Sequence, residues 1–365
     1  MESMVNKQIT QVNRYFWKGK RVFLTGHTGF KGGWLTLWLA DMGAEVYGYA
    51  LNPPTEPNFF RVCNLEAQLA GSTIADIRDA TVLTQAMQAA RADIVFHLAA
   101  QPLVRYSYTA PVETYFVNVM GTVNLLEAVR QTPSVKAVVN VTTDKCYENR
   151  EWLWPYRENE AMGGFDPYSS SKACSELVTA AYRSSFLEPA GIHLASARAG
   201  NVIGGGDWAS DRLIPDFLKA LDVERSLTIR SPHATRPWQH VFEPLAGYLM
   251  LAQALFEEGK AFASPWNFGP EDGDARSVQW IVEYLCNHVP GASWQCEASL
   301  QLHEANMLKL DSSKAKTELG WQPRWNLQTA LGMTLEWHKA WQQSEDMVLV
   351  SQAQIHHYEA SQKSE

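Results

Sequence analysis

Tyr168 and Lys172 are four residues apart, near the start of a segment expected to be a helix. At that spacing two side chains share one face of a helix, one turn apart. A lysine ammonium beside a phenol favours the phenolate and lowers the pKa of the tyrosine, so the pair could accept a proton from a hydroxyl group. The alternative is an ordinary exposed pair on a helix surface.

A second polar set, Thr142, Thr143, Asp144 and Lys145, follows the apolar run KAVVNV at 136–141. A hydroxyl, a carboxylate and an amine in succession can supply substrate hydrogen bonding, a general acid and a general base. In open parallel sheets, ligands bind beyond the carboxyl ends of the strands, where this set would lie. The alternative is a capped turn with no role in chemistry.

Glycines at positions 26, 29 and 32 separate an apolar strand, expected at 21–24, from an apolar helix, expected at 34–41. A strand, a glycine turn and a helix in that order bring backbone N–H groups and the positive end of a helix together, which suits a pyrophosphate. The spacing is GxxGxxG rather than GxGxxG. Its weight therefore comes from its place at a strand-to-helix junction near the chain start.

Strands and helices alternate from this turn onward. Further strands are expected at 44–51, 71–76, 93–98, 136–142 and 192–199, and helices at 79–90, 111–131 and 167–187. This rhythm predicts an α/β fold with a doubly wound parallel sheet of the Rossmann type. The regular alternation of strands and helices ends after Gly200. We therefore expect a dinucleotide-binding domain at 18–200, with some later segments returning to it, a smaller mixed α/β substrate region at 201–342, and a polar, loosely held tail at 343–365.

Composition narrows the class of protein. The chain has 365 residues and a net charge of -8, with no lysine or arginine block, which argues against a nucleic-acid partner. No apolar run is long enough to span a membrane, and the first residues lack an apolar signal core. The five cysteines are scattered without a CxxC pair. We therefore expect reduced thiols in a cytoplasmic enzyme, and no metal site.

Three motifs together resemble the extended short-chain dehydrogenase/reductase family: TGHTGFKG at 25–32, HLAAQ at 97–101 and YSSSK at 168–172. Thr143-Asp144 followed by a third polar residue resembles the nucleotide-sugar 4,6-dehydratase branch. That third residue is usually glutamate in dTDP- and GDP-sugar members, and here it is Lys145. GHTGFKG, TTDKCYEN and RAGNVIGGGDW resemble the members that act on CDP-D-glucose. The resemblance covers about 18–341.

The resemblance implies an NAD-dependent, redox-neutral dehydration of CDP-D-glucose to CDP-4-keto-6-deoxy-D-glucose, in deoxysugar biosynthesis of the lipopolysaccharide O-antigen type. Tyr168 would take the C4 hydroxyl proton, and Lys172 would contact the nicotinamide ribose. Thr143 would bind the sugar near O4, and Asp144 would protonate the departing C6 hydroxyl. Lys145 would be the base at C5, which requires a pKa lowered by burial or a neighbouring cation. Alternatively Lys145 only orients groups, and Asp144 or a water moves the proton.

The resemblance also implies the residues that contact NAD: Gly26, His27, Thr28, Gly29, Phe30, Lys31, Gly32, Asn52, Asp76, Ile77, Leu98, Ala99, Ala100, Thr142, Tyr168 and Lys172. Asn52 departs from the pattern, because the family commonly has an acidic residue there for the adenosine ribose. A neutral amide discriminates less against a 2′-phosphate. We therefore expect NAD to be preferred but bound more loosely.

For the nucleotide sugar, the implied contacts are Gln101, Thr143, Asn201, Arg212, Lys219, Arg236 and His240. Arg236 suits the diphosphate, since a guanidinium pairs with two oxygens at once. Three other polar residues are expected to be structural: His97 at a strand end, Asn118 within a helix, and Arg198 in an ion pair.

Helices 111–131 and 166–187 carry more apolar positions than one sheet face needs, and family members pair these helices in a dimer. We therefore expect a homodimer; deeper burial within one chain is the alternative. Rival functions are a nucleotide-sugar epimerase, a dehydratase acting on another nucleotide sugar, or a non-catalytic NAD-binding scaffold. Asp144 and Lys145 argue against the epimerase, because epimerases usually lack this pair.

Overall fold

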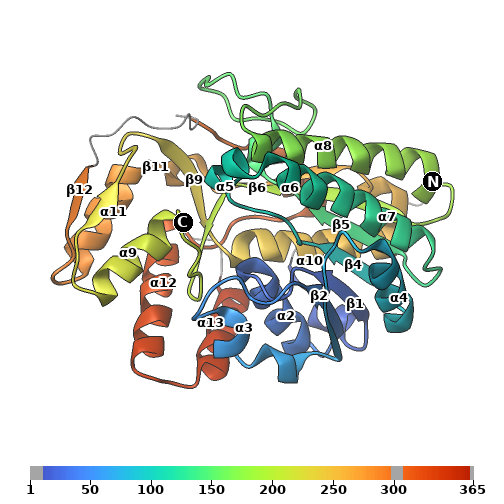
Figure 1. Cartoon of the computed structure of the whole chain (residues 1–365), viewed down its shortest axis with the longest axis horizontal. Coiled ribbons are helices and arrows are strands. Elements are labelled where there is room, and N and C mark those ends of the chain that lie inside the picture. Colours follow the sequence, from blue (N-terminus) through green and yellow to red (C-terminus); the bar gives the residue numbers. More distant parts are fainter. Residues whose placement is uncertain (1–10, 297–306, 362–365) are drawn as a thin grey trace, which may run out of the picture.

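The computed structural model describes residues 11–296 and 307–361. Its centre is a seven-stranded sheet in the order β3-β2-β1-β4-β5-β6-β10, in which every neighbouring pair is parallel (Figure 1). The strands are β1 Arg21–Thr25, β2 Glu45–Ala50, β3 Gly71–Ile74, β4 Ile94–His97, β5 Ala137–Val141, β6 His193–Ala199 and β10 Pro265–Phe268. The predicted doubly wound parallel sheet is confirmed.

Successive residues along each strand point to opposite sides of the sheet, so apolar side chains lie on both faces. Helices cover both of these faces. Leu24 and Phe96 pack with α2 Phe30–Asp41 and α10 Phe242–Glu258 in one core. Phe23 and Val95 pack in the other core. The helices on that second face are α4 Ala80–Ala90, α7 Gly121–Arg130 and α8 Pro167–Tyr182. Both faces are apolar, which explains why the central strands read as continuous apolar runs.

Most expected elements are found within one to three residues of their predicted ends. Asp79 caps α4 as expected, with its carboxylate accepting from the Thr81 and Val82 amides at 3.1 and 3.0 Å. Helix α2 begins at Phe30 instead of Trp34, because Gly29 serves as its N-cap and the Gly29 carbonyl accepts from the Gly33 amide. The expected helix 111–131 consists of α6 Pro111–Tyr115, the π segment η2 Phe116–Met120 and α7.

The region after β6 forms two small sheets and a separate core. Strands β7 Asn201–Ile203, β9 Thr235–His240 and β11 Ala275–Ser277 make one sheet, and β8 Leu227–Ile229 pairs with β12 Trp294–Cys296. Around them lie α9 Leu213–Asp222, α11 Val278–His288 and α12 Leu327–Gln342. Two later segments lie against the large sheet: β10 pairs with β6, and α10 covers one face.

Short helices complete the chain: α1 Arg14–Trp17, α3 Phe59–Val62, α5 Val104–Thr109, η1 Leu65–Gln68, η3 Asp144–Cys146, η4 Arg183–Leu187, η5 Gly259–Phe262, η6 Asp272–Asp274 and η7 Ala315–Leu319. In the part of the chain that the structure describes, no helix combines the length and the apolar character needed to cross a membrane.

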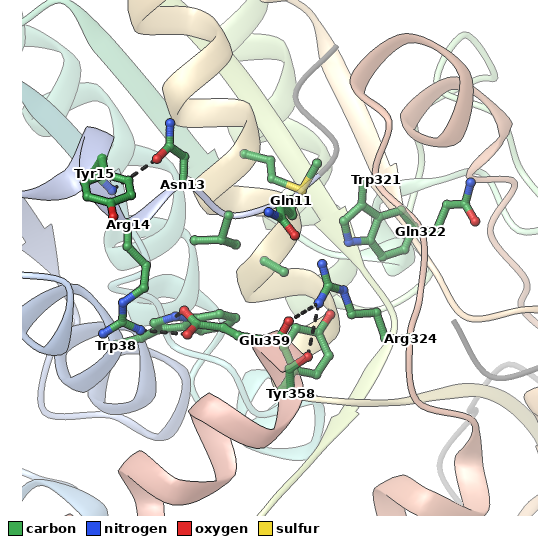
Figure 2. A pocket seen from close by; sticks show the side chains of 13 residues that line it. Gln11, Asn13, Arg14, Tyr15, Trp38, Trp321, Gln322, Arg324, Tyr358 and Glu359 are labelled. Carbon is green, nitrogen blue, oxygen red and sulfur yellow. Dashed lines mark hydrogen bonds and ion pairs between the residues drawn. The ribbon is translucent and has the colours of Figure 1, made fainter. Parts of the chain in front are cut away.

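The polar tail expected at 343–365 is instead ordered over most of its length, because α13 Met347–Ala360 docks on the large core. Tyr358 and Ile355 are buried there. Figure 2 shows the adjoining pocket, where Arg14 pairs with Glu359 at 2.7 Å and Arg324 donates to backbone carbonyls near the end of α13. The sequence did not predict this helix because two of its buried positions, Ser351 and Gln354, are polar.

Candidate active site

The glycine turn between β1 and α2 is as tight as its sequence suggested. Gly26 has a φ of +82°, and a Cβ there would lie 2.8 Å from the Ala99 amide nitrogen. A Cβ on Gly32 would lie 2.1 Å from the Gly26 carbonyl oxygen. Gly29 caps α2 without any side-chain hydrogen bond. The first amides of α2 therefore receive no side-chain cap, as an anion-binding helix end requires.

The His27 side chain supports this turn from inside the protein. Its ring is buried, packs against Phe60, and has Nε2 2.9 Å from the Ser72 hydroxyl. Gly48 makes room for it, since a Cβ there would lie 2.4 Å from the ring. Burial lowers the pKa of His27 to about 4, so the ring is neutral. The expected cofactor contact of His27 could therefore come only from its backbone.

Several other expected cofactor contacts lie near the carboxyl ends of β1 to β4. Thr28 donates to the Leu51 carbonyl at 2.8 Å, next to the exposed Asn52. Ile77 is buried, and Leu98, Ala99 and Ala100 are half-buried after β4. Asp76 is paired with Arg78 at 2.5 Å, a partner that the sequence reading did not identify.

The catalytic candidates meet where η3 follows β5 and where α8 begins. Thr143 donates to Asp144 Oδ1 at 2.9 Å and accepts from the Lys145 amide at 3.4 Å. Tyr168 is buried, and its hydroxyl lies close enough to Thr143 for that side chain to act on its pKa, which links the two motifs. The structure thus brings together the two polar sets that the sequence separates by more than twenty residues.

Asp144 is suited to hold a proton. Burial raises its pKa, and the nearby Lys145, Thr143, Arg236 and Lys31 oppose that rise. Its Oδ2 atom is buried without a hydrogen-bond partner in the described residues. A buried carboxyl with one unpartnered oxygen can present a proton to a ligand.

The lowered tyrosine pKa expected from Lys172 is not found: burial raises the pKa of Tyr168 to about 12. The pKa of Lys172 is itself lowered to about 8 by burial, although the charge of Glu176 raises it. The Lys172 ammonium donates to the Val141 carbonyl at 3.3 Å. Desolvation is therefore the largest influence on both pKa values.

Lys31 has a position that its motif did not reveal. It follows the first residue of α2, and its amino group interacts with the charges of Asp144, Lys172, Arg212 and Asp207. Burial lowers the pKa of Lys31 to about 8. Lys145, the expected base, is half-buried beside Asp144. Two lysines therefore lie near the same carboxyl group.

Three of the seven substrate candidates lie near the catalytic group: Thr143, Arg212 and Arg236. Arg212 pairs with Asp207 at 2.9 Å, and its charge acts on Tyr168. Arg236 is buried on β9, and its charge acts on Asp144.

The other four differ in accessibility. Asn201 is half-buried on β7. The side-chain amide of Gln101 is hydrogen-bonded to the Leu103 backbone and to the Thr114 hydroxyl. Lys219 is exposed on α9. His240 is fully buried and packs against Phe242 and Trp325, which makes it part of the core.

The three residues expected to be structural make such contacts. His97 Nδ1 is 2.7 Å from the Thr25 hydroxyl. The Asn118 side chain accepts from the backbone amide of Gln101 at 2.8 Å and donates to the Ser171 hydroxyl of α8 at 2.9 Å. Arg198 forms a buried ion pair with Glu176 at 2.8 Å.

The order of the parallel sheet, the glycine turn and the tyrosine–lysine pair define a Rossmann-type fold of the extended short-chain dehydrogenase/reductase class. The sequence profile of the GDP-mannose 4,6-dehydratase family matches residues 23–334, and the chain belongs to this family. A CDP-glucose 4,6-dehydratase of Salmonella typhimurium is 55% identical over 95% of this chain and 98% of its own length. A UDP-glucose 4-epimerase of Halalkalibacterium halodurans is 26% identical over 87% of this chain and 95% of its own.

Solved structures agree on the fold. A dTDP-glucose 4,6-dehydratase of Streptomyces venezuelae, crystallised with NAD, has a TM-score of 0.74 at 24% identity, over 90% of this chain and 99% of its own. A UDP-glucose 4-epimerase of Stenotrophomonas maltophila has a TM-score of 0.76 at 20% identity, over 89% and 99% of the two chains. Dehydratases and epimerases thus share this fold, and the residues of the site must separate them.

Proposed function

We propose that this protein catalyses the NAD-dependent dehydration of CDP-D-glucose to CDP-4-keto-6-deoxy-D-glucose and water. The observation that carries the proposal is the identity of 55% over nearly the whole chain with a CDP-glucose 4,6-dehydratase. The hydrogen bond from Thr143 to Asp144, together with the proximity of Tyr168 to both side chains, supports it. An epimerase has no use for the acid that Asp144 provides.

The residues of the glycine turn fit a dinucleotide. The side-chain-free cap at Gly29 and the close packing at Gly26 and Gly32 leave a turn that a pyrophosphate can approach. Asn52, Asp76 and Ile77 would bind the adenosine portion, and Lys172 the nicotinamide ribose. When bound, NAD supplies the acceptor for the C4 hydride and the donor that returns it to C6.

The residues of this chain handle the protons. Tyr168 accepts the proton of the C4 hydroxyl group, while Thr143 holds O4. Because burial opposes its ionisation, Tyr168 needs a positive charge beside it, and Lys172 with a pKa of about 8 carries one at neutral pH. The 4-ketone makes the C5 proton acidic, and Lys145 removes it. Asp144, whose pKa is raised, gives its proton to the departing C6 hydroxyl.

The diphosphate of the substrate would be held by arginines. Arg236 and Arg212 approach the catalytic group from β9 and from the residue preceding α9. Asn201 and Gln101 would add neutral hydrogen bonds. Lys219 and His240 are weaker candidates because one is exposed and the other is in the core.

A panel of nucleotide sugars tests the proposal. The enzyme with NAD is incubated with CDP-, dTDP-, GDP- or UDP-glucose, and mass spectrometry follows the loss of water. Loss from CDP-glucose alone is the expected result. Loss from another member would transfer the mechanism to that substrate, and an unchanged mass for all four would contradict a dehydratase.

We further propose a cytoplasmic homodimer that serves deoxysugar biosynthesis of the lipopolysaccharide O-antigen type. Phe116 and Val112 expose 54% and 70% of their surface on η2 and α6, and Leu177 exposes 60% on α8. These apolar side chains would pair the two helices with those of a second copy. A monomeric mass by light scattering at working concentration would reject the dimer.

A further inference from the structure

We propose that Glu176, locked by Arg198, is a positioning residue that keeps Lys172 charged and directed towards the reacting groups. The proposal rests on the dehydratase function above and deepens it. Tyr168, Lys172 and Glu176 follow one another at four-residue intervals along α8, and all three side chains are buried. They therefore form a single stripe on the helix face that meets the sheet.

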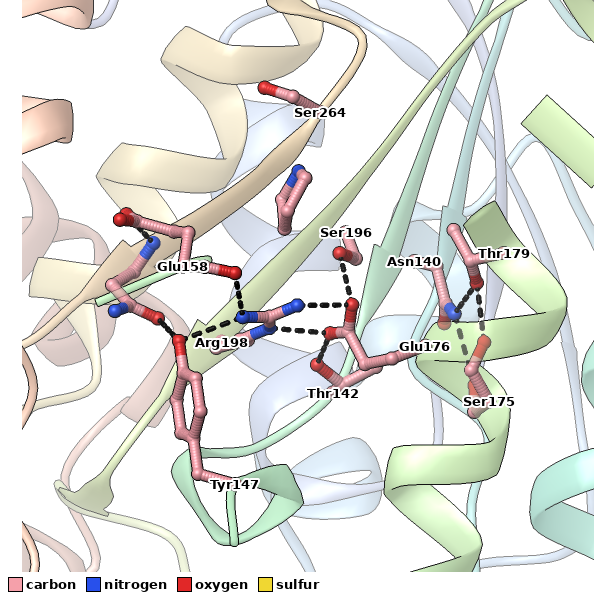
Figure 3. Close-up of polar contacts among 12 residues, drawn as sticks. Asn140, Thr142, Tyr147, Glu158, Ser175, Glu176, Thr179, Ser196, Arg198 and Ser264 are labelled. Atoms are coloured by element: carbon pink, nitrogen blue, oxygen red, sulfur yellow. Dashed lines mark hydrogen bonds and ion pairs between the residues drawn. The ribbon is translucent and has the colours of Figure 1, made fainter. Parts of the chain in front are cut away.

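The Glu176 carboxylate is saturated by donors from the sheet. Thr142 and Arg198 Nε donate to Oε1, the latter at 2.9 Å. Ser196 and the Arg198 terminal nitrogen donate to Oε2 at 2.6 and 2.8 Å (Figure 3). A buried carboxylate with this many donors remains ionised, and its pKa is accordingly lowered.

Arg198 is in turn held in place on its other side. Its third nitrogen donates to the Tyr147 hydroxyl at 2.7 Å and to the Glu158 carbonyl at 3.2 Å. The Tyr147 hydroxyl donates to Asn267 of β10 at 2.7 Å. The ion pair is thus connected to β10, and neither partner can swing away without breaking several hydrogen bonds.

Glu176 and Lys172 are tied to adjacent residues at the end of β5. Lys172 donates to the Val141 carbonyl, and the next residue, Thr142, donates to Glu176. The Glu176 carboxylate is therefore fixed one turn of α8 after Lys172. It raises the pKa of Lys172 against the lowering caused by burial.

The other titratable groups that face Lys172 do not supply this charge. Burial raises the pKa of the Cys146 thiol of η3 and lowers that of His97 of β4 to about 3, so both are neutral. Lys31 of α2 is a like charge. Tyr168 lies on the adjacent turn of α8, and burial raises its pKa to about 12, which opposes a negative charge there. Glu176 is therefore the anion on which the charge of Lys172 depends.

The test is the pH dependence of kcat/KM for CDP-glucose in Glu176→Gln, Glu176→Asp and the wild type. We expect the alkaline limb, where Lys172 loses its proton, to move about one pH unit lower in Glu176→Gln. Glu176→Asp, which keeps the charge, should return the limb towards the wild-type position. Glu283→Gln, which removes an exposed carboxylate from α11, is the matched control and should leave the profile unchanged.

A purely structural role predicts a different result: kcat would fall by one factor at every pH while the limb stayed in place, and this would overturn the proposal. Glu176→Gln leaves Arg198 buried without its counter-charge, so the double variant Glu176→Gln/Arg198→Gln is measured as well, and the same downward shift is expected.

The proposal can also be tested without turnover. An NMR titration of labelled lysine, with the Lys172 signal assigned by its loss in Lys172→Arg, should show the lower pKa in Glu176→Gln. An unchanged lysine pKa would refute the role of Glu176. Wild-type enzyme that fails to dehydrate CDP-glucose would refute only the proposed function.

Discussion

Thr143 donates a 2.9 Å hydrogen bond to Oδ1 of Asp144, while Oδ2 of the same carboxyl group is buried without a partner in the described residues. One oxygen is thus held in place and the other is left for a ligand. Together with the pKa raised by burial, this arrangement favours Asp144 as a proton donor.

We expect Asp144→Asn to slow water loss from CDP-glucose by about 10²–10⁴-fold, the usual contribution of a general acid. The amide keeps the size of the side chain and can still accept from Thr143, but it carries no transferable proton. Oxidation at C4 should persist, so NADH should accumulate and be visible by absorbance. Water loss at the wild-type rate would contradict the assignment.

The proposed role of Lys145 is to remove the C5 proton of the sugar, and it is tested by following that proton. If Lys145 is the C5 base, Lys145→Ala should slow the exchange of C5 deuterium with solvent by about 10²-fold or more. Lys31→Met is measured beside it, because Lys31 is the lysine near Asp144 whose pKa is lowered to about 8. Exchange at the native rate in Lys145→Ala would exclude the base role, and a loss confined to Lys31→Met would transfer it to that lysine.

The glycine turn offers a matched pair of variants. Gly32→Ala puts a Cβ 2.1 Å from the Gly26 carbonyl oxygen, so the turn must open. A Cβ on Gly29 would lie 3.4 Å from the same atom, an ordinary contact. We expect Gly32→Ala to weaken NAD binding by at least tenfold and to lower Tm, with Gly29→Ala much closer to wild type in Tm. Equal Tm values in the two variants would show that the turn is not constrained as described.

Asn52 sets the expected cofactor preference. A neutral side chain at this position forms weaker hydrogen bonds to a ribose diol than a carboxylate does. Asn52→Asp should therefore tighten NAD binding several-fold and weaken NADP binding, as measured by titration calorimetry. Wild-type protein with equal affinity for the two dinucleotides would defeat the assignment of NAD.

The buried carboxyl group of Glu243 should make the free energy of unfolding depend on pH. Its carboxylate accepts from the Arg324 and Trp325 amides and from Tyr358, yet burial raises its pKa from 4.5 to about 7. The folded state therefore binds more protons than the unfolded state between about pH 4.5 and pH 7. The stability that this group contributes is complete below pH 4.5 and declines as the pH rises through that interval.

The same group can be isolated by comparing two proteins. From pH 5 to pH 8 the free energy of unfolding of the wild type should fall by up to a few kcal/mol relative to Glu243→Gln, because glutamine does not titrate. Denaturant unfolding at several pH values measures the difference. Parallel pH curves for the two proteins would show that Glu243 titrates normally.

The local pattern of the chain determined the architecture and the motifs. Alternating strands and helices give a parallel sheet, because each apolar strand must be covered on both faces. The glycines of the turn and the spacing of Tyr168 and Lys172 are likewise local features, so the sequence sufficed to place the glycines after β1 and the pair near the start of α8. The Asp79 cap of α4 is a local feature of the same kind.

Tertiary packing decided the properties that depend on burial. It turned the His27 ring inwards, put His240 in the core, and directed Lys31 towards Asp144. It also gave Tyr168 a raised pKa, and it converted the polar segment after Asp346 into a docked helix. Desolvation and charge depend on neighbours that are distant in the sequence, and the chain order alone does not say which neighbours these are.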